Sequence, residues 1–226
     1  PVFMILIGKL TEARTRKRWS LLSRLSSHFL DLVCGLETLR ANGQADAQTD
    51  SIADVGERYR RETMGTLRIG FLSALVLEHG GNEAEAIAAL LHDAAEDCGG
   101  RPMLDTVRVM FGDAVAEIVE ACTDTMEEPK PDWRPRKEAY VAHLAGASPS
   151  IKLVAGCDKL HNLQTTLRDL RAGQPADYWS RFTAGADSQA WYYGECGKAL
   201  AGSLVAADFE RAYGDFLQLL TERGDL

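Results

Sequence analysis

Apolar residues recur at helical spacing along most of this chain. Residues 19–40 show the stripe of an amphipathic helix, and residues 41–54 are small, polar and acidic, which is typical of a linker. No segment alternates with a period of two for long, and no internal repeat is visible. The pattern predicts an all-α protein, with further helices over 72–78, 84–97, 102–110, 113–122, 137–144, 151–170 and 204–223.

Capping residues predict where several of these helices begin and end. Asn82 followed by Glu85 predicts a capping box before the helix at 84–97, and Gly99-Gly100 predicts its end. Asp113 is expected to cap the helix at 113–122, and Ser148 the helix at 151–170.

Composition limits the function classes that fit this chain. At 226 residues with 46% hydrophobic and 26% charged residues, it is long enough for one sizeable domain with an extension. A net charge of −8 argues against a general nucleic-acid or membrane-surface binder, because an acidic surface does not attract a polyanion.

The five cysteines include no CxxC pair, so a reduced, cytoplasmic setting is expected. The apolar opening PVFMILIG is too short to span a bilayer, and the chain does not begin with Met, so its start is interpreted as a fragment boundary.

Four polar side chains lie close together in the otherwise apolar segment 84–97. On one continuous helix His92 lies over Glu96, and Asp93 lies over Asp97. An imidazole nitrogen and a carboxylate oxygen can hold one metal ion, and carboxylates one turn later can handle water bound to it. The segment therefore indicates metal-assisted hydrolysis.

A second polar stripe lies on the predicted helix at 151–170. Asp158, His161, Asn162 and Thr165 fall at i, i+3, i+4 and i+7, on one face. If this face meets His92, Asp158 becomes a third metal ligand and Asn162 can reach a substrate. His161 is interpreted as a structural hydrogen-bonding residue.

These segments resemble a known family. LLHDAAED followed about sixty residues later by CDKLHNLQTT resembles the HD-domain metal-dependent phosphohydrolases, specifically the SpoT-type (p)ppGpp hydrolases. The resemblance runs from Ala74 to about Trp191. It implies an all-α HD-domain helical bundle that binds one divalent metal, usually Mn²⁺, and hydrolyses the 3′-pyrophosphate of guanosine tetra- or pentaphosphate.

The resemblance also assigns roles to individual residues. It implies that His92, Asp93 and Asp158 bind the metal, and that Glu96 and Asp97 act on the attacking water.

The resemblance and the predicted loop supply substrate-binding candidates. Lys159 and Asn162 match the part of the family motif that contacts the nucleotide. Residues 126–138 contain three prolines, which predict a loop, and also a dense cluster of cations. From this cluster Arg134 and Lys137 are candidates to bind phosphate; the alternative is a solvated loop.

One family feature is missing. Family members carry a further ligand histidine in a segment G-T-x-x-P-Y-x-x-H, but here Gly65-Thr66 is followed by LRIGFLSALVLEHGG, and without gaps the histidine position falls on Arg68. A metal held by three ligands would bind more weakly, or the Arg68 guanidinium would take the place of the metal charge and leave the site inert. His79 and His28 are not obvious substitutes. A shifted reading frame or a recombined start upstream of Ala74 is a further hypothesis.

We divide the chain into an N-terminal extension, residues 1–50, and an HD phosphohydrolase domain, residues 51–226. The first functional hypothesis is a small (p)ppGpp 3′-pyrophosphohydrolase without a synthetase region. The alternatives are a catalytically inactive HD module that binds a nucleotide or a protein, and an HD phosphohydrolase of another nucleotide. The basic N-terminal helix is interpreted as a packing element or an oligomer contact.

Overall fold

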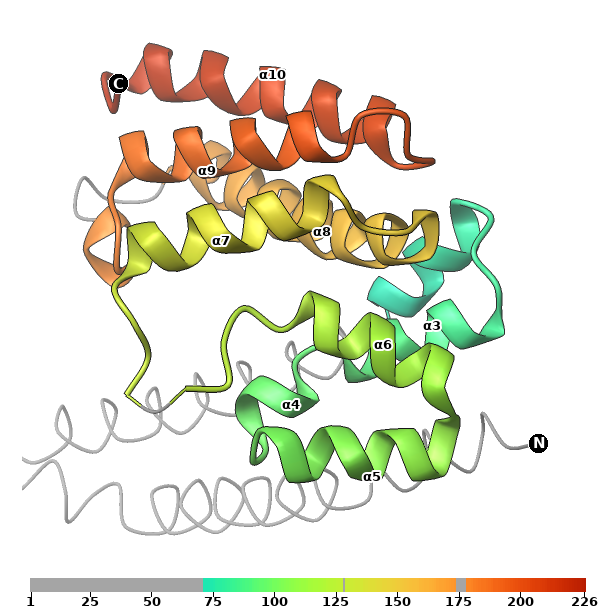
Figure 1. Cartoon of the computed structure of the whole chain (residues 1–226). Coiled ribbons are helices and arrows are strands. Elements are labelled where there is room, and N and C mark those ends of the chain that lie inside the picture. Colours follow the sequence, from blue (N-terminus) through green and yellow to red (C-terminus); the bar gives the residue numbers. More distant parts are fainter. Residues whose placement is uncertain (1–70, 128, 174–177) are drawn as a thin grey trace, which may run out of the picture. The chain divides into compact units, whose positions relative to one another are not determined.

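Helices make up most of the chain that is described in a computed structural model, residues 71–127, 129–173 and 178–226 (Figure 1). No β-strand occurs within these ranges, which confirms the predicted all-α class. After a helical segment at 71–78, the elements are α3 (Glu83–Leu91), α4 (Ala94–Asp97), α5 (Arg101–Phe111), α6 (Asp113–Cys122), α7 (Trp133–Ala145), α8 (Pro149–Arg171), the short 3₁₀ helix η1 (Tyr178–Arg181), α9 (Ala186–Ala199) and α10 (Ala206–Arg223).

The long helix α8 connects the layers of the bundle. It contacts α3, α6, α9 and α10, while α5 packs on α6 and α7 packs on α9 (Figure 1). Leu153, Leu160 and Leu163 on α8 are almost completely buried, as are Phe209 and Phe216 on α10. Since α8 is surrounded by other helices, its buried polar residues have fixed positions in the fold.

Most of the capping predictions are confirmed. Asn82 Oδ1 accepts a hydrogen bond from the Glu85 N–H at 3.1 Å, and the Asn82 N–H donates to Glu85 Oε2 at 2.7 Å, which is a complete capping box. Ser148 Oγ accepts from the Ile151 N–H at 3.4 Å. The prediction for Asp113 was wrong, because Gly112 occupies the N-cap position of α6 and Asp113 is its first residue.

Two further expectations differ from the structure. The predicted loop at 126–138 ends early, because α7 already begins at Trp133 and includes Pro135. Proline is tolerated in the first turn of a helix, where its missing N–H has no intrahelical partner. The aromatic stretch at 179–194 was not assigned to a helix, yet its second part lies in α9.

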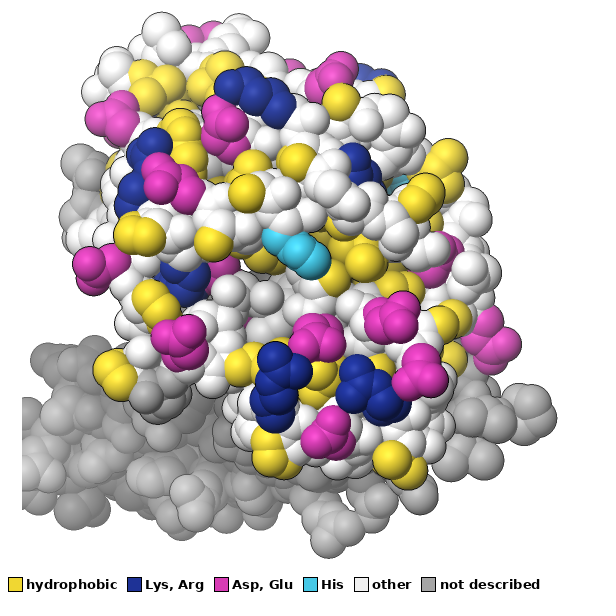
Figure 2. All heavy atoms as spheres, in the orientation of Figure 1, with side chains coloured by type: hydrophobic (Ala, Val, Ile, Leu, Met, Phe, Trp, Pro, Cys, Tyr) yellow, Lys and Arg dark blue, Asp and Glu magenta, His cyan; other side chains and the backbone are white. Residues whose placement is uncertain are grey.

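The surface carries both signs of charge. In Figure 2 acidic and basic side chains lie next to one another on the face that is shown, in keeping with exposed ion pairs such as Arg101–Glu120 at 2.9 Å. None of the described helices is long and apolar enough to cross a bilayer.

Close packing of α8 generates a first prediction. A methyl group at Gly156 would overlap the Val205 side chain and lie 3.0 Å from Leu200, and both neighbours are buried. Gly156→Ala should therefore lower the free energy of unfolding by about 1–3 kcal/mol, as measured by urea denaturation.

Gly214 is the matched control, because it lies inside α10 and a methyl group added there would have no neighbouring atom within 4 Å. Gly214→Ala should raise stability by up to about 1 kcal/mol through helix propensity alone. Equal effects of the two substitutions would contradict the packing argument.

Candidate metal-dependent active site

The site begins where the predicted helix at 84–97 is interrupted. α3 ends at Leu91, His92 and Asp93 form a turn, and α4 covers only Ala94–Asp97. The prediction of one continuous helix was wrong. The His92 side chain is only 5% exposed, whereas 53% of the Asp93 side chain is exposed.

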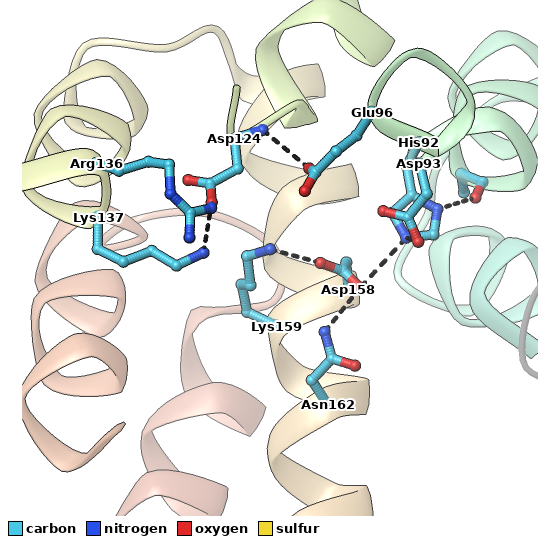
Figure 3. A network of polar contacts seen from close by, with 10 residues as sticks. His92, Asp93, Glu96, Asp124, Arg136, Lys137, Asp158, Lys159 and Asn162 are labelled. Atoms are coloured by element: carbon cyan, nitrogen blue, oxygen red, sulfur yellow. Dashed lines mark hydrogen bonds and ion pairs between the residues drawn. The ribbon is translucent and has the colours of Figure 1, made fainter. Parts of the chain in front are cut away.

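His92 Nε2 faces two carboxylates. It lies 3.0 Å from Asp93 Oδ2 and 3.4 Å from Asp158 Oδ1 (Figure 3). The turn after α3 carries His92 and Asp93, and α8 carries Asp158 about sixty residues later in the sequence. The fold thus brings the three predicted metal ligands together.

The hydrogen bonding of the ring suits a metal ligand. His92 Nδ1 lies 2.9 Å from the Ala89 carbonyl oxygen, which can only accept, so Nδ1 carries a proton and donates it. Nε2 is buried and faces the Asp93 and Asp158 carboxylates at ion-pair distance. A histidine whose far nitrogen is fixed by a carbonyl presents the other nitrogen to a metal.

The spacing of the three side chains also suits a metal. Two ligands at about 2.1 Å from one ion are separated by about 3.0 Å at a right angle and about 3.4 Å at the tetrahedral angle. The two distances from Nε2 match these values. As they stand, no three His, Cys, Asp or Glu side chains among the described residues form a complete metal site. The donor set fits a divalent metal, while the complete coordination geometry is not present.

Electrostatics couple the three groups. Burial alone would lower the pKa of His92, but hydrogen bonding and charge from Asp158 and Asp93 raise it to about 10. Burial would raise the pKa of Asp158, but the charges of Lys159 and His92 hold it well below its usual value. The pKa of Asp93 is also lowered, against the effect of burial, by His92. The cluster therefore holds a proton on the imidazole where a metal would bind.

Lys159 and Asn162 lie next to Asp158. Lys159 Nζ donates to Asp158 Oδ2 at 2.7 Å, and Asn162 Nδ2 donates to Asp158 Oδ1 at 2.9 Å (Figure 3). Asp158 raises the pKa of Lys159 well above its usual value, despite burial. Both predicted substrate-binding residues on α8 thus orient the carboxylate that faces His92.

Glu96 is held by groups from the following loop. Its Oε1 accepts from Lys130 Nζ at 2.7 Å. Its Oε2 accepts from the Asp124 N–H at 3.4 Å (Figure 3). Glu96 therefore does not bond to His92 one turn earlier. Asp97 is exposed.

Asp124 connects Glu96 to a pair of partly buried cations. Its Oδ2 is bonded to Arg136 Nη1 and to Lys137 Nζ, the latter at 2.8 Å (Figure 3). Lys137 was among the residues predicted from the sequence, but Asp124 was missed. The sequence offered one indication of its role, because Asp124 follows directly after the buried stripe of α6. Its partners Arg136 and Lys137, however, lie 12 and 13 residues further along the chain.

The remaining predicted residues lie elsewhere. Arg134 stacks on the Trp191 ring, 3.4 Å from its centroid, and pairs with Glu138 at 2.8 Å, so it does not contact the His92 cluster. His79 Nε2 lies 3.1 Å from Asp208 on α10. Arg68, His28 and the division at residue 50 lie outside the described residues, so the expectations for them stay predictions.

Comparison with known proteins identifies the family. The HD domain family model matches residues 58–178, which is more than half of the chain. The chain belongs to the HD domain family, as the sequence motifs predicted.

The chain is similar to hydrolases of the predicted branch. It is 42% identical over 93 residues to the human guanosine-3′,5′-bis(diphosphate) 3′-pyrophosphohydrolase MESH1, a match covering 41% of this chain and 46% of MESH1. A solved structure described as a metazoan ortholog of SpoT that hydrolyses ppGpp matches with a TM-score of 0.51 and 25% identity, over 70% of this chain and 81% of the other. The chain spans about half the length of this curated hydrolase.

The chain is also similar to a transport protein. It is 44% identical over 77 residues to the glutathione/L-cysteine transport system ATP-binding/permease protein CydC of Bacillus subtilis. This match covers 34% of the chain but only 14% of the transport protein.

The raised pKa of His92 generates a prediction for the metal-free protein. A folded-state pKa of about 10 against 6.5 in the unfolded chain means that imidazole protonation stabilises the fold fully below pH 6.5. This contribution is lost as the pH rises toward 10. In EDTA, the free energy of unfolding of the parent should fall between pH 6.5 and 10 more steeply than that of His92→Gln; parallel curves would contradict the ion-pair geometry.

Asp124 generates a second prediction. Its side chain is only 9% exposed and balances Arg136 and Lys137. Asp124→Asn leaves these partly buried cations without their anion and should cost up to about 3 kcal/mol of stability, as measured by urea denaturation.

Asp105, whose side chain is 72% exposed and pairs with Arg108, is the control. Asp105→Asn should change stability by no more than about 1 kcal/mol. A similarly small effect at Asp124 would show that solvent already neutralises the two cations.

Proposed function

We propose that this protein is a metal-dependent (p)ppGpp hydrolase that removes the 3′-pyrophosphate of guanosine tetra- or pentaphosphate. The observation that carries the proposal is the convergence of His92 Nε2 with the Asp93 and Asp158 carboxylates at 3.0 and 3.4 Å, in an HD domain. The similarity to MESH1 supports the choice of substrate.

His92, Asp93 and Asp158 would hold one divalent metal, for which we infer Mn²⁺ from the family resemblance. When bound, such an ion supplies Lewis acidity toward a phosphate oxygen and toward water. The proton on His92 Nε2 must leave before this nitrogen can bind an ion, so metal binding should release protons.

Glu96 is the group that we assign to proton transfer. Lys130 and the Asp124 N–H fix its carboxylate orientation. A positioned carboxylate can accept a proton from the water that attacks the phosphorus and return it to the ribose 3′-oxygen, which leaves when the bond between this oxygen and the phosphorus breaks. Asp97, which is exposed one residue later, is the second candidate for this role.

The cations beside the metal ligands support an anionic substrate. Burial, and after it the positive charge of Lys159, lowers the pKa of Lys137, so the two ammonium groups lie close enough to repel each other. A phosphate group between them would relieve this repulsion. The Tyr140 hydroxyl lies in the same region, with Lys159 Nζ 5.1 Å from the ring centroid, and finds no hydrogen-bond partner among the described residues. This hydroxyl would then donate to a phosphate oxygen.

We do not extend the transport function of the CydC-like proteins to this chain. The match covers only 14% of that protein, and a short segment does not carry the function of the whole.

The direct test is pyrophosphate release from labelled ppGpp by the purified protein with Mn²⁺. Asp158→Asn should abolish release, because it removes a proposed metal ligand. Glu96→Gln should lower kcat about 100- to 10,000-fold, since it removes a proton acceptor. Removal of the metal with EDTA should abolish release in the parent, and Mn²⁺ should restore it.

Asp169→Asn is the matched control, because Asp169 lies on the same helix but pairs with Arg181 at 2.8 Å. It should retain the parental rate. Absence of release from the parent, or equal rates in Asp158→Asn, would overturn the proposal. Binding of ppGpp without turnover would instead indicate the inactive HD module.

A further inference from the structure

A groove on the other side of α8 presents a second set of cations. Its volume is about 570 Å³, within the range of small-molecule sites. It is lined from α8 by Gln164, Leu167, Arg168 and Arg171, and from α10 by Asp208, Arg211, Ala212 and Asp215.

The lining follows one helical register on each side. On both helices the four residues fall at i, i+3, i+4 and i+7, so each helix contributes one continuous stripe, and the two helices pack against each other. At 100° per residue, the groove stripe of α8 lies about 120° around the helix from the stripe that contains Asp158 and Asn162. The groove is therefore separate from the proposed active site.

Arg168 is the uncompensated cation of the groove. Arg171 pairs across it with Asp215 at 2.8 Å, and Arg211 pairs with Asp208 on its own helix at 2.9 Å. The Arg168 guanidinium makes no hydrogen bond or ion pair to any residue in the described ranges. It is exposed between these two pairs, so the lining has an unbalanced positive charge in a chain of net charge −8.

The floor of the groove is apolar. Leu167 and Ala212 are only 4% and 9% exposed, and the Gln164 amide lies beside them. A planar or apolar body can cover these two side chains, while an anionic group meets Arg168. The exposed pairs of Arg171 and Arg211 are individually weak, so both guanidinium groups can exchange their carboxylate partners for a phosphate.

We propose that this groove between α8 and α10 binds a small phosphate ester of nucleotide size, with its phosphate on Arg168 and its body over Leu167 and Ala212. The site is independent of the proposed hydrolase activity. Its ligand contacts the same rigid helix that carries Asp158.

The test uses AMP as the probe and the Gln164 side-chain amide as the reporter, observed by NMR in metal-free buffer. The reporter signal is identified by its absence in Gln164→Met. AMP should shift this signal in a saturable manner. Arg168→Gln should weaken the binding about ten- to a hundredfold, the range for loss of a charged hydrogen-bonding partner.

Arg101→Gln is the matched control, because Arg101 is exposed on α5 and pairs with Glu120. It should bind AMP like the parent. An unshifted Gln164 signal, unchanged affinity in Arg168→Gln, or equal weakening in both variants would overturn the proposal. Arg168→Gln should release pyrophosphate from ppGpp at the parental rate, so failure of the groove and failure of the hydrolase are distinguishable.

Discussion

The contact between His92 Nε2 and the Asp158 carboxylate joins the two halves of the site. His92 is the C-cap residue of α3 and keeps helical backbone dihedrals, and Asp158 lies on α8, which packs against four neighbouring helices. The arrangement of the candidate ligands therefore depends on where α3 ends and on how α8 is packed.

Charge compensation explains how so many ionisable groups share the interior. Asp158 accepts from Lys159 and Asn162, and Asp124 accepts from Arg136 and Lys137. An unpaired buried charge costs several kcal/mol, so these contacts are necessary for the fold as well as for the site. The network is not neutral throughout, since Lys137 and Lys159 repel each other. An anionic ligand gains the most favourable electrostatic energy where such positive charge is not already balanced.

The sequence predicted the residues of the site better than their local geometry. His92, Asp93 and Asp158 could be selected as candidate ligands, and the structure brings their side chains together, because metal ligands are restricted to a few residue types at recognisable spacing. The turn at His92 was not predictable, because the alanine-rich segment around it favours one uninterrupted helix. Asp124 was missed for another reason: its role comes from partners beyond a loop, and spacing along one helix carries no information about such contacts. Pro135 likewise indicated a loop, although a first-turn proline is compatible with a helix.

The histidine that the family resemblance leads us to expect ahead of Ala74 falls on Arg68, which lies outside the described residues, so a recombined start stays a hypothesis. The described ligands would then be one imidazole and two carboxylates. Since Asp93 and Asp158 already approach His92 closely, loss of a further nitrogen ligand would affect chiefly the affinity of the proposed site for a metal and the number of coordination positions left open on that metal.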